Sequence, residues 1–205
     1  AGLISFNYSA SAKGKWVIEE RTEEGVWIEL TSNVAENLNG KFVMRDFVHP
    51  EKSDQKYSTY VRIKYVSDYA EVVELSNLSI LPTANATVDK SELIVYDTQI
   101  EKLSITTNNL RQVSFDITED FQIVDTDQNV LDADALSDLF VNGTQVHDIY
   151  IQYTNTKKAA VTYGKLEIKT NKDAMGDDIA PKVLATVNLI GLMKVHTQCS
   201  AMGQR

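Results

Sequence analysis

Lys15-Trp16-Val17-Ile18-Glu19-Glu20-Arg21 and Val26-Trp27-Ile28-Glu29-Leu30 are the two stretches of sequence that decide the fold. Apolar and polar side chains alternate in both, which is the period of a β-strand with one buried face. The residues between them, Thr22-Glu23-Glu24-Gly25, are polar and end on a glycine, as turns often do. We therefore predict a β-hairpin over residues 15–30.

The same alternation recurs along the rest of the chain. Further strands are predicted over residues 3–8, 41–48, 57–66, 70–75, 78–81, 92–96, 103–107, 113–117, 121–124, 147–153, 164–170 and 183–192. Only Asp132 to Phe140 favours one or two helical turns. Short strands at close spacing, without long helical periods, indicate an all-β protein of antiparallel sheets and argue against a βαβ architecture.

The chain has 205 residues, which is about twice the length of a single β-sandwich of roughly 100 residues. Residues 83–90 are small and polar, as expected of a short linker. We therefore predict two antiparallel β-sandwich modules, the first over residues 1–84 and the second over residues 85–193. Residues 171–181 are predicted to be a loop, and residues 194–205 a tail.

Composition limits the classes of partner. The formal net charge is −9, so phosphate backbones are repelled and no nucleic-acid partner is expected. The single cysteine, Cys199, cannot form a disulfide within the chain. No apolar run reaches 18 residues, so no membrane insertion is expected. Ala1 is not a start methionine and no signal peptide opens the chain, which predicts a processed or excised polypeptide whose leader lies outside this numbering.

The first module resembles the C-terminal part of the jelly-roll modules of bacterial surface proteins. The hairpin over residues 15–30, the Tyr60-Val61-Arg62-Ile63-Lys64-Tyr65 strand and the closing stretch from Val73 to Ile80 carry this resemblance. It implies a carbohydrate-binding or adhesion module. In such modules an acidic pair near the end of the closing strand often lies beside a calcium ion. This chain has Ser76-Asn77 at that position, which does not favour calcium.

The resemblance also implies that the front of the jelly roll is absent from residues 1–82. On that basis the strand from Leu3 to Tyr8 is predicted to be an edge with unpaired backbone groups, which are prone to pair with another chain. We expect this edge to be covered by a partner subunit or by a preceding segment.

The second module resembles the Ig-like repeats that follow such modules. Its landmarks are the Leu93–Tyr96 strand, the Ile149–Tyr153 strand with Thr154-Asn155-Thr156, the Gly164–Ile168 strand and the ending from Ala185 to Gly191. Repeats of this kind serve as spacers or assembly modules, so the resemblance implies no catalytic site.

The sequence contains no motif that predicts catalysis or metal binding, and no cofactor is expected. Glu19, Glu20, Glu23 and Glu24 crowd one hairpin, but neighbours in a strand point to opposite faces, so we interpret them as solvated. Asp125-Thr126-Asp127-Gln128-Asn129 opens like an EF-hand loop but lacks the later glycine and glutamate, which favours a polar turn. His49, His147 and His196 have no spaced partner for zinc.

Aromatic residues supply the candidate binding site. Trp16 and Trp27 are interpreted as core, although either ring could stack on a sugar. The candidate ligand-binding residues are Tyr57, Tyr60, Arg62 and Tyr69. Alternation places Val61, Ile63 and Tyr65 on the core face, and Tyr60, Arg62 and Lys64 on the other face. That second face suits a polar or anionic ligand such as an acidic glycan; the alternative is that its long side chains only cover the sheet.

These observations predict a non-catalytic binding, adhesion or spacer module of a larger exported bacterial protein, secreted or on the cell surface, with a glycan or protein partner. Two alternatives stay open. One is a structural assembly subunit, of the phage decoration, fibre or pilus-like kind. The other is the accessory portion of a surface enzyme whose catalytic domain lies elsewhere.

Overall fold

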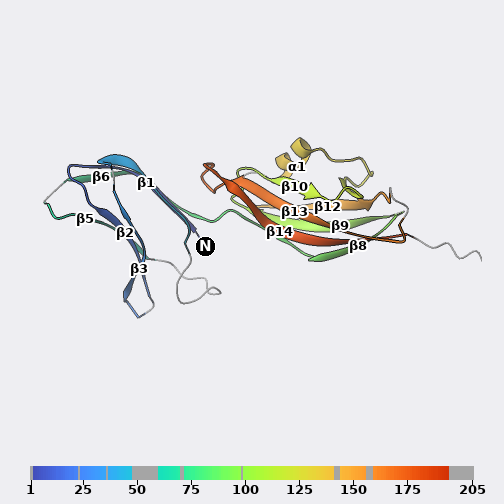
Figure 1. Ribbon diagram of the computed structural model, residues 1–205, viewed down its shortest axis with the longest axis horizontal. Helices are drawn as coiled ribbons and strands as arrows, with labels where there is room; N and C mark the ends of the chain where they lie inside the picture. Colours follow the sequence, from blue (N-terminus) through green and yellow to red (C-terminus); the bar gives the residue numbers. More distant parts are fainter. Residues whose placement is uncertain are drawn as a thin grey trace, which may run out of the picture. The chain divides into compact units, whose positions relative to one another are not determined.

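The computed structural model describes residues 2–22, 24–35, 37–47, 60–69, 72–97, 99–140, 144–155 and 159–193. These residues form an all-β protein with fourteen strands and one short helix, as predicted (Figure 1). The chain divides into two compact units, residues 1–83 and residues 84–205, which we call unit 1 and unit 2.

Unit 1 consists of two three-stranded antiparallel sheets. The first has the order β4-β1-β6 and the second the order β3-β2-β5. The strands are β1 (Gly2–Ala10), β2 (Lys15–Arg21), β3 (Trp27–Val34), β4 (Asn39–Phe47), β5 (Val61–Val66) and β6 (Val73–Pro82). The predicted hairpin is confirmed, because β2 pairs with β3 across the turn that contains Gly25 at a φ of 85°.

An aromatic cluster joins the two sheets of unit 1. Phe6 of β1 packs edge-on against Trp16 of β2, with ring centroids 4.8 Å apart, and stacks on Phe42 of β4 at 4.9 Å. Ile4 and Ile18 complete the centre of this core, and both are fully buried. The layers are held together by apolar side chains from facing strands, which is the construction of a β-sandwich.

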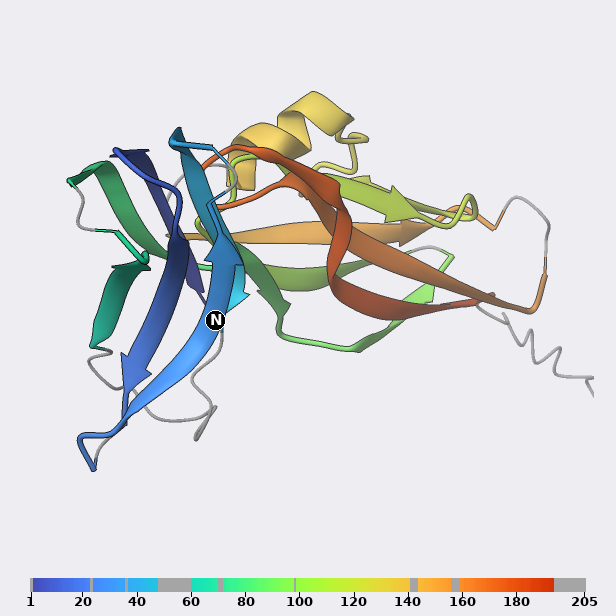
Figure 2. The same cartoon turned by 60° about the vertical axis from the view of Figure 1, so that its left-hand side comes forward.

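The predicted edge at Leu3–Tyr8 is wrong. β1 is the central strand of its sheet, because it pairs with β4 on one side and with β6 on the other. Its partners are 30 to 80 residues away in the chain, so local alternation could not reveal them. Among the described strands, β6 lies at the edge of that sheet, next to β1 (Figure 2). β6 itself joins the two predicted strands 70–75 and 78–81 into one, with a bulge where Asn77 adopts a φ of 53°.

Unit 2 consists of two four-stranded sheets, with the orders β11-β12-β9-β7 and β10-β13-β14-β8. Its elements are β7 (Asn85–Val88), β8 (Glu92–Tyr96), β9 (Ile100–Asn108), β10 (Ser114–Ile117), β11 (Phe121–Val124), α1 (Ala133–Phe140), β12 (Thr144–Tyr153), β13 (Val161–Lys172) and β14 (Asp178–Leu192). The helix is confirmed where it was predicted. It starts after Asp132, whose carboxylate accepts the backbone N–H of Ala135 at 2.8 Å, an N-cap.

Three details of unit 2 differ from the prediction. β8 runs parallel to β14, so this sheet is mixed and not wholly antiparallel. The predicted linker contains β7, which pairs with β9 and buries Ala86. The predicted loop over residues 171–181 is mostly strand: β13 and β14 form a long hairpin, and the turn between them is closed by Asp173 and Gly176. The side chains of β7 and of the hairpin ends of β13 and β14 are mostly polar because they face solvent, so the sequence favoured a linker and a loop there.

Within the described residues, no helix is long and apolar enough to cross a lipid bilayer.

Candidate functional site

The predicted binding residues lie around β5 but do not form one site. Tyr60 precedes β5 and Tyr69 follows it, and their side chains are 63% and 74% exposed. The six residues of β5 alone span about 20 Å, so the two rings lie at opposite ends of the strand. Tyr57 lies outside the described residues. The predicted division of faces is confirmed, because Val61, Ile63 and Tyr65 pack against the core.

Arg62 belongs to an ionic cluster on the outer face of the β3-β2-β5 sheet. Its Nε donates to Oε2 of Glu19 at 2.5 Å, and Nζ of Lys64 donates to Oε1 of the same carboxylate at 2.6 Å. The guanidinium of Arg62 also lies 4.3 Å from the ring centroid of Trp27. We call Glu19, Trp27, Arg62 and Lys64 the Glu19 cluster.

The Glu19 cluster is satisfied by its own members. The hydrogen bond from Lys64 and the charge and hydrogen bond of Arg62 hold the pKa of Glu19 below its usual value, although burial opposes this shift. A carboxylate held ionised by two cations has no proton to donate as a general acid. Two interpretations of this hairpin are wrong. Trp27 was expected in the core, but it lies on the outer face of the sheet. Glu19 and Glu20 were expected to be solvated, but both are buried. Trp16 is core, as predicted.

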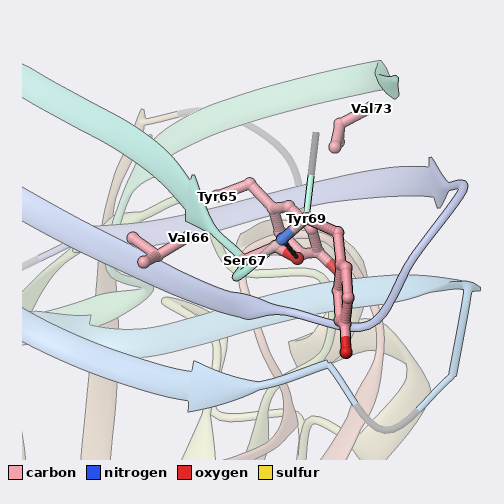
Figure 3. A pocket seen from close by; sticks show the side chains of 5 residues that line it. All are labelled: Tyr65, Val66, Ser67, Tyr69 and Val73. Atoms are coloured by element: carbon pink, nitrogen blue, oxygen red, sulfur yellow. Dashed lines mark hydrogen bonds between the residues drawn. The ribbon is translucent and has the colours of Figure 1, made fainter. Parts of the chain in front are cut away.

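A shallow, open depression with a volume of about 510 Å³ lies where β5 ends and β6 begins. Its wall is formed by Tyr65, Val66, Ser67, Tyr69 and Val73 (Figure 3). The hydroxyl of Tyr65 donates to the carbonyl of Ala12 at 2.7 Å, and Oγ of Ser67 donates to the carbonyl of Lys13 at 2.9 Å. These bonds fix the wall, while the exposed ring of Tyr69 forms the rim. We call this cavity the Tyr69 pocket.

The inner side of β6 continues from the Tyr69 pocket and is only half covered. Ile80 lies opposite Ile4 and Leu75 lies opposite Tyr8, so these side chains point toward the space between the two sheets. Ile4 is fully buried, yet Leu75, Leu78 and Ile80 are 46%, 54% and 49% exposed. No described strand pairs with the far side of β6. We call Leu75, Leu78 and Ile80 the open face of unit 1.

Unit 2 carries a second cavity, of about 650 Å³, between β10, β11 and α1. Its size is within the range of small-ligand pockets. Apolar side chains form much of its wall, among them Val113, Phe115, Ile123, Leu131 and Leu136. Helix α1 closes one side, because Leu136 and Phe140 are buried against the sheets.

The Asp125–Asn129 segment is the polar turn that the sequence favours. Oδ1 of Asp125 accepts the backbone N–H groups of Asp127 and Asn129 at 2.8 and 2.9 Å, and Oδ2 accepts the amide of Asn129 at 3.0 Å. These bonds lower the pKa of Asp125 and occupy its oxygens. In the described part of the chain, no group of three or more His, Cys, Asp or Glu side chains could hold a metal ion.

Sequence reasoning missed two of these features. The open face of unit 1 is formed by residues that were assigned to strands, but their exposure depends on which strands lie beside them. The cavity in unit 2 forms between β10, β11 and α1, and the signal for it was the amphipathic segment Asp132–Phe140, with Leu136 and Phe140 on one side.

No family model matches the chain, and no similar protein was found among curated proteins or solved structures.

Proposed function

We propose that the chain is a non-catalytic extracellular binding module of a larger exported bacterial protein, located on the cell surface or secreted. Unit 1 serves as the ligand-binding part, and unit 2 serves as a spacer. The observation that carries the proposal is the Tyr69 pocket, a shallow depression lined by the hydrogen-bonded side chains of Tyr65 and Ser67, with the exposed ring of Tyr69 beside them.

The chemistry of the Tyr69 pocket suits a glycan. Sugar rings combine apolar faces with hydroxyl groups, and a tyrosine ring offers an apolar face together with a polar tip. Tyr65 and Ser67 add hydroxyl groups to the lining of the pocket. Oγ of Ser67 donates to the carbonyl of Lys13 at 2.9 Å and accepts the backbone N–H of Tyr69 at 3.3 Å. We place the ligand here and not on the predicted Tyr60–Arg62 face, because the Glu19 cluster already engages Arg62.

The strand orders support a two-module interpretation. In unit 2, the order β11-β12-β9-β7 corresponds to strands D-E-B-A of an immunoglobulin constant-type sandwich, and β10-β13-β14 corresponds to C-F-G. In unit 1, six strands are divided between two layers, with the hairpin of β2 and β3 in one of them, which is compatible with part of an eight-stranded jelly roll. Both assignments rest on topology and belong to the proposal.

A glycan-array screen with the labelled chain tests this function. We expect binding that is lost in Tyr69→Ala and retained in Tyr163→Ala, because Tyr163 is similarly exposed, at 76%, but lies in unit 2. Binding that both variants retain would exclude the Tyr69 pocket.

A structural assembly subunit is the second candidate function, and the open face of unit 1 favours it. Edges with exposed apolar side chains pair readily with other chains. A chain that binds no glycan on the array but self-associates in solution would support this second candidate over the first.

A further inference from the structure

Two rows of apolar side chains lie on the outer face of unit 2, across the neighbouring strands β8, β14 and β13 (Figure 1). The first row is Ile94, Ile190 and Tyr163, and the second row is Tyr96, Leu192 and Val161. Alternate residues of these strands, such as Val95 and Leu189, are buried in the core, so the six side chains of the two rows point outward. We call these six residues the Tyr163 patch.

The Tyr163 patch is exposed although it is apolar. Tyr163 is 76% exposed, and Ile94, Tyr96 and Val161 are 46%, 38% and 44% exposed. Together the six residues expose roughly 500 Å², which is the size of the largest apolar patches on soluble monomers. Patches of this size with a polar border are often interaction sites.

We propose that two copies of the chain associate face to face through the Tyr163 patch, about a twofold axis that lies along β14 between the copies. The proposal is independent of glycan binding. In this pair β14 faces β14, and β13 of each copy faces β8 of the other. Tyr163 then lies opposite Ile94 of the second copy, and Val161 lies opposite its Tyr96. Sheets packed in this way lie about 10 Å apart, with strand directions within about 30° of each other.

The row beside the patch favours a second copy as the occupant. It consists of Glu92 on β8, Asn188 on β14 and Lys165 on β13. The axis that joins the apolar rows also places Lys165 of each copy opposite Glu92 of the other, so opposite charges meet at two places in the dimer. In one copy Lys165 donates to Glu167. Glu167 also has Lys169 at 2.9 Å, so it keeps a cation when Lys165 turns toward the second copy.

The direction of the axis follows from the same rows. An axis across the strands would lay the first apolar row on the second and leave the charged row without a partner. The axis along β14 buries all three rows. The joined surface is then roughly 600 Å² per copy, or roughly 1,200 Å² in total, at the lower end for specific interfaces. We therefore expect a weak, reversible dimer.

Sedimentation velocity on the 205-residue chain, from about 1 µM to about 500 µM, tests the proposal. We expect a monomer at the lowest concentration and a dimer at the highest. Val161→Glu should raise the dissociation constant by roughly 10-fold or more, because part of a valine's burial is lost in each of two copies and a charge is introduced. Val146→Glu is the matched control and should leave the dimer unchanged, because Val146 is 64% exposed on β12, in the other sheet.

Exchange of the two charges tests the axis. Lys165→Glu alone should weaken the dimer by roughly 5-fold or more, because it places like charges opposite each other at both contacts. The double variant Lys165→Glu/Glu92→Lys should restore the dissociation constant to within about 3-fold of that of the native chain. Thermal melting curves show whether each variant is folded.

A monomer throughout the concentration range overturns the proposal, and so does open-ended polymerisation. A dimer that Val161→Glu leaves intact, or one that the double exchange does not restore, overturns it as well. At about 1 µM the proposed dimer is dissociated, so a glycan array run at that concentration tests the Tyr69 pocket separately.

Discussion

Gly191 offers a sharp test of how the two sheets of unit 2 fit together. A Cβ atom at this position would lie 2.6 Å from Cδ2 and 2.7 Å from Cε2 of Tyr153, on the facing sheet. The ring of Tyr153 cannot retreat easily, because it is 1% exposed and its centroid lies 5.2 Å from that of Phe121. Its hydroxyl is also held, by Asn155 at 2.9 Å and Thr162 at 2.6 Å. Gly191→Ala therefore forces the sheets apart or displaces the ring.

The expected cost follows from this geometry. Overpacking by one methyl group in a rigid core destabilises a protein by about 1–3 kcal/mol. Alanine has less conformational freedom than glycine in the unfolded chain, and this stabilises the folded state by about 0.4–1 kcal/mol. We therefore expect a net loss of about 1–2 kcal/mol, which lowers the melting temperature of a unit of roughly 100 residues by about 4–8 °C.

The assay uses the distribution of tryptophan. Both tryptophans of the chain, Trp16 and Trp27, lie in unit 1, so their fluorescence follows the unfolding of unit 1, whereas calorimetry detects both units. Gly191→Ala should lower one calorimetric transition and leave the fluorescence midpoint unchanged. In a Tyr153→Leu background the same substitution should cost close to nothing, because the clash is with the ring. An equal cost in both backgrounds would refute the packing argument.

Two further predictions concern unit 1. Phe6→Ala should destabilise unit 1 by about 3–5 kcal/mol, because Phe6 is 1% exposed and contacts two other rings; the fluorescence midpoint should fall while the other calorimetric transition stays. The stability that Glu19 contributes is fully present above its ordinary pKa near 4.5 and is lost as the pH falls through its lowered pKa in the folded state. Urea unfolding followed by fluorescence from pH 7 to pH 3 should therefore show a steeper acid loss in the native chain than in Glu19→Gln, and parallel curves would contradict this assignment.

The sequence predicted features that depend on near neighbours. The hairpin of β2 and β3, the short helix α1 and the two faces of β5 are all confirmed. Each follows from alternation, a turn or a cap within about ten residues, and such signals act locally. The polar turn at Asp125 belongs to the same group, since its carboxylate bonds to groups only two and four residues away.

Features that depend on distant partners were missed. Trp27 was interpreted as core because it is a large aromatic residue, but it pairs with Arg21 on the outer face of the sheet, and its ring lies beside Arg62, 35 residues away in the chain. The burial of Glu19 has the same origin, because the cations that compensate it come from β5. A carboxylate in an alternating strand looks solvated until its partners across the sheet are known.

The misplaced edge shows why the position of a strand within its sheet had to come from the structure. Alternation tells which face of a strand is apolar. It does not tell whether a strand is central or at an edge, because that is decided by pairing with segments far away in the chain. The physical reason for expecting association applies to whichever strand has a free side: unpaired backbone groups next to apolar side chains. In the described part of the chain, β4 and β6, and not β1, lie at the edges of that sheet.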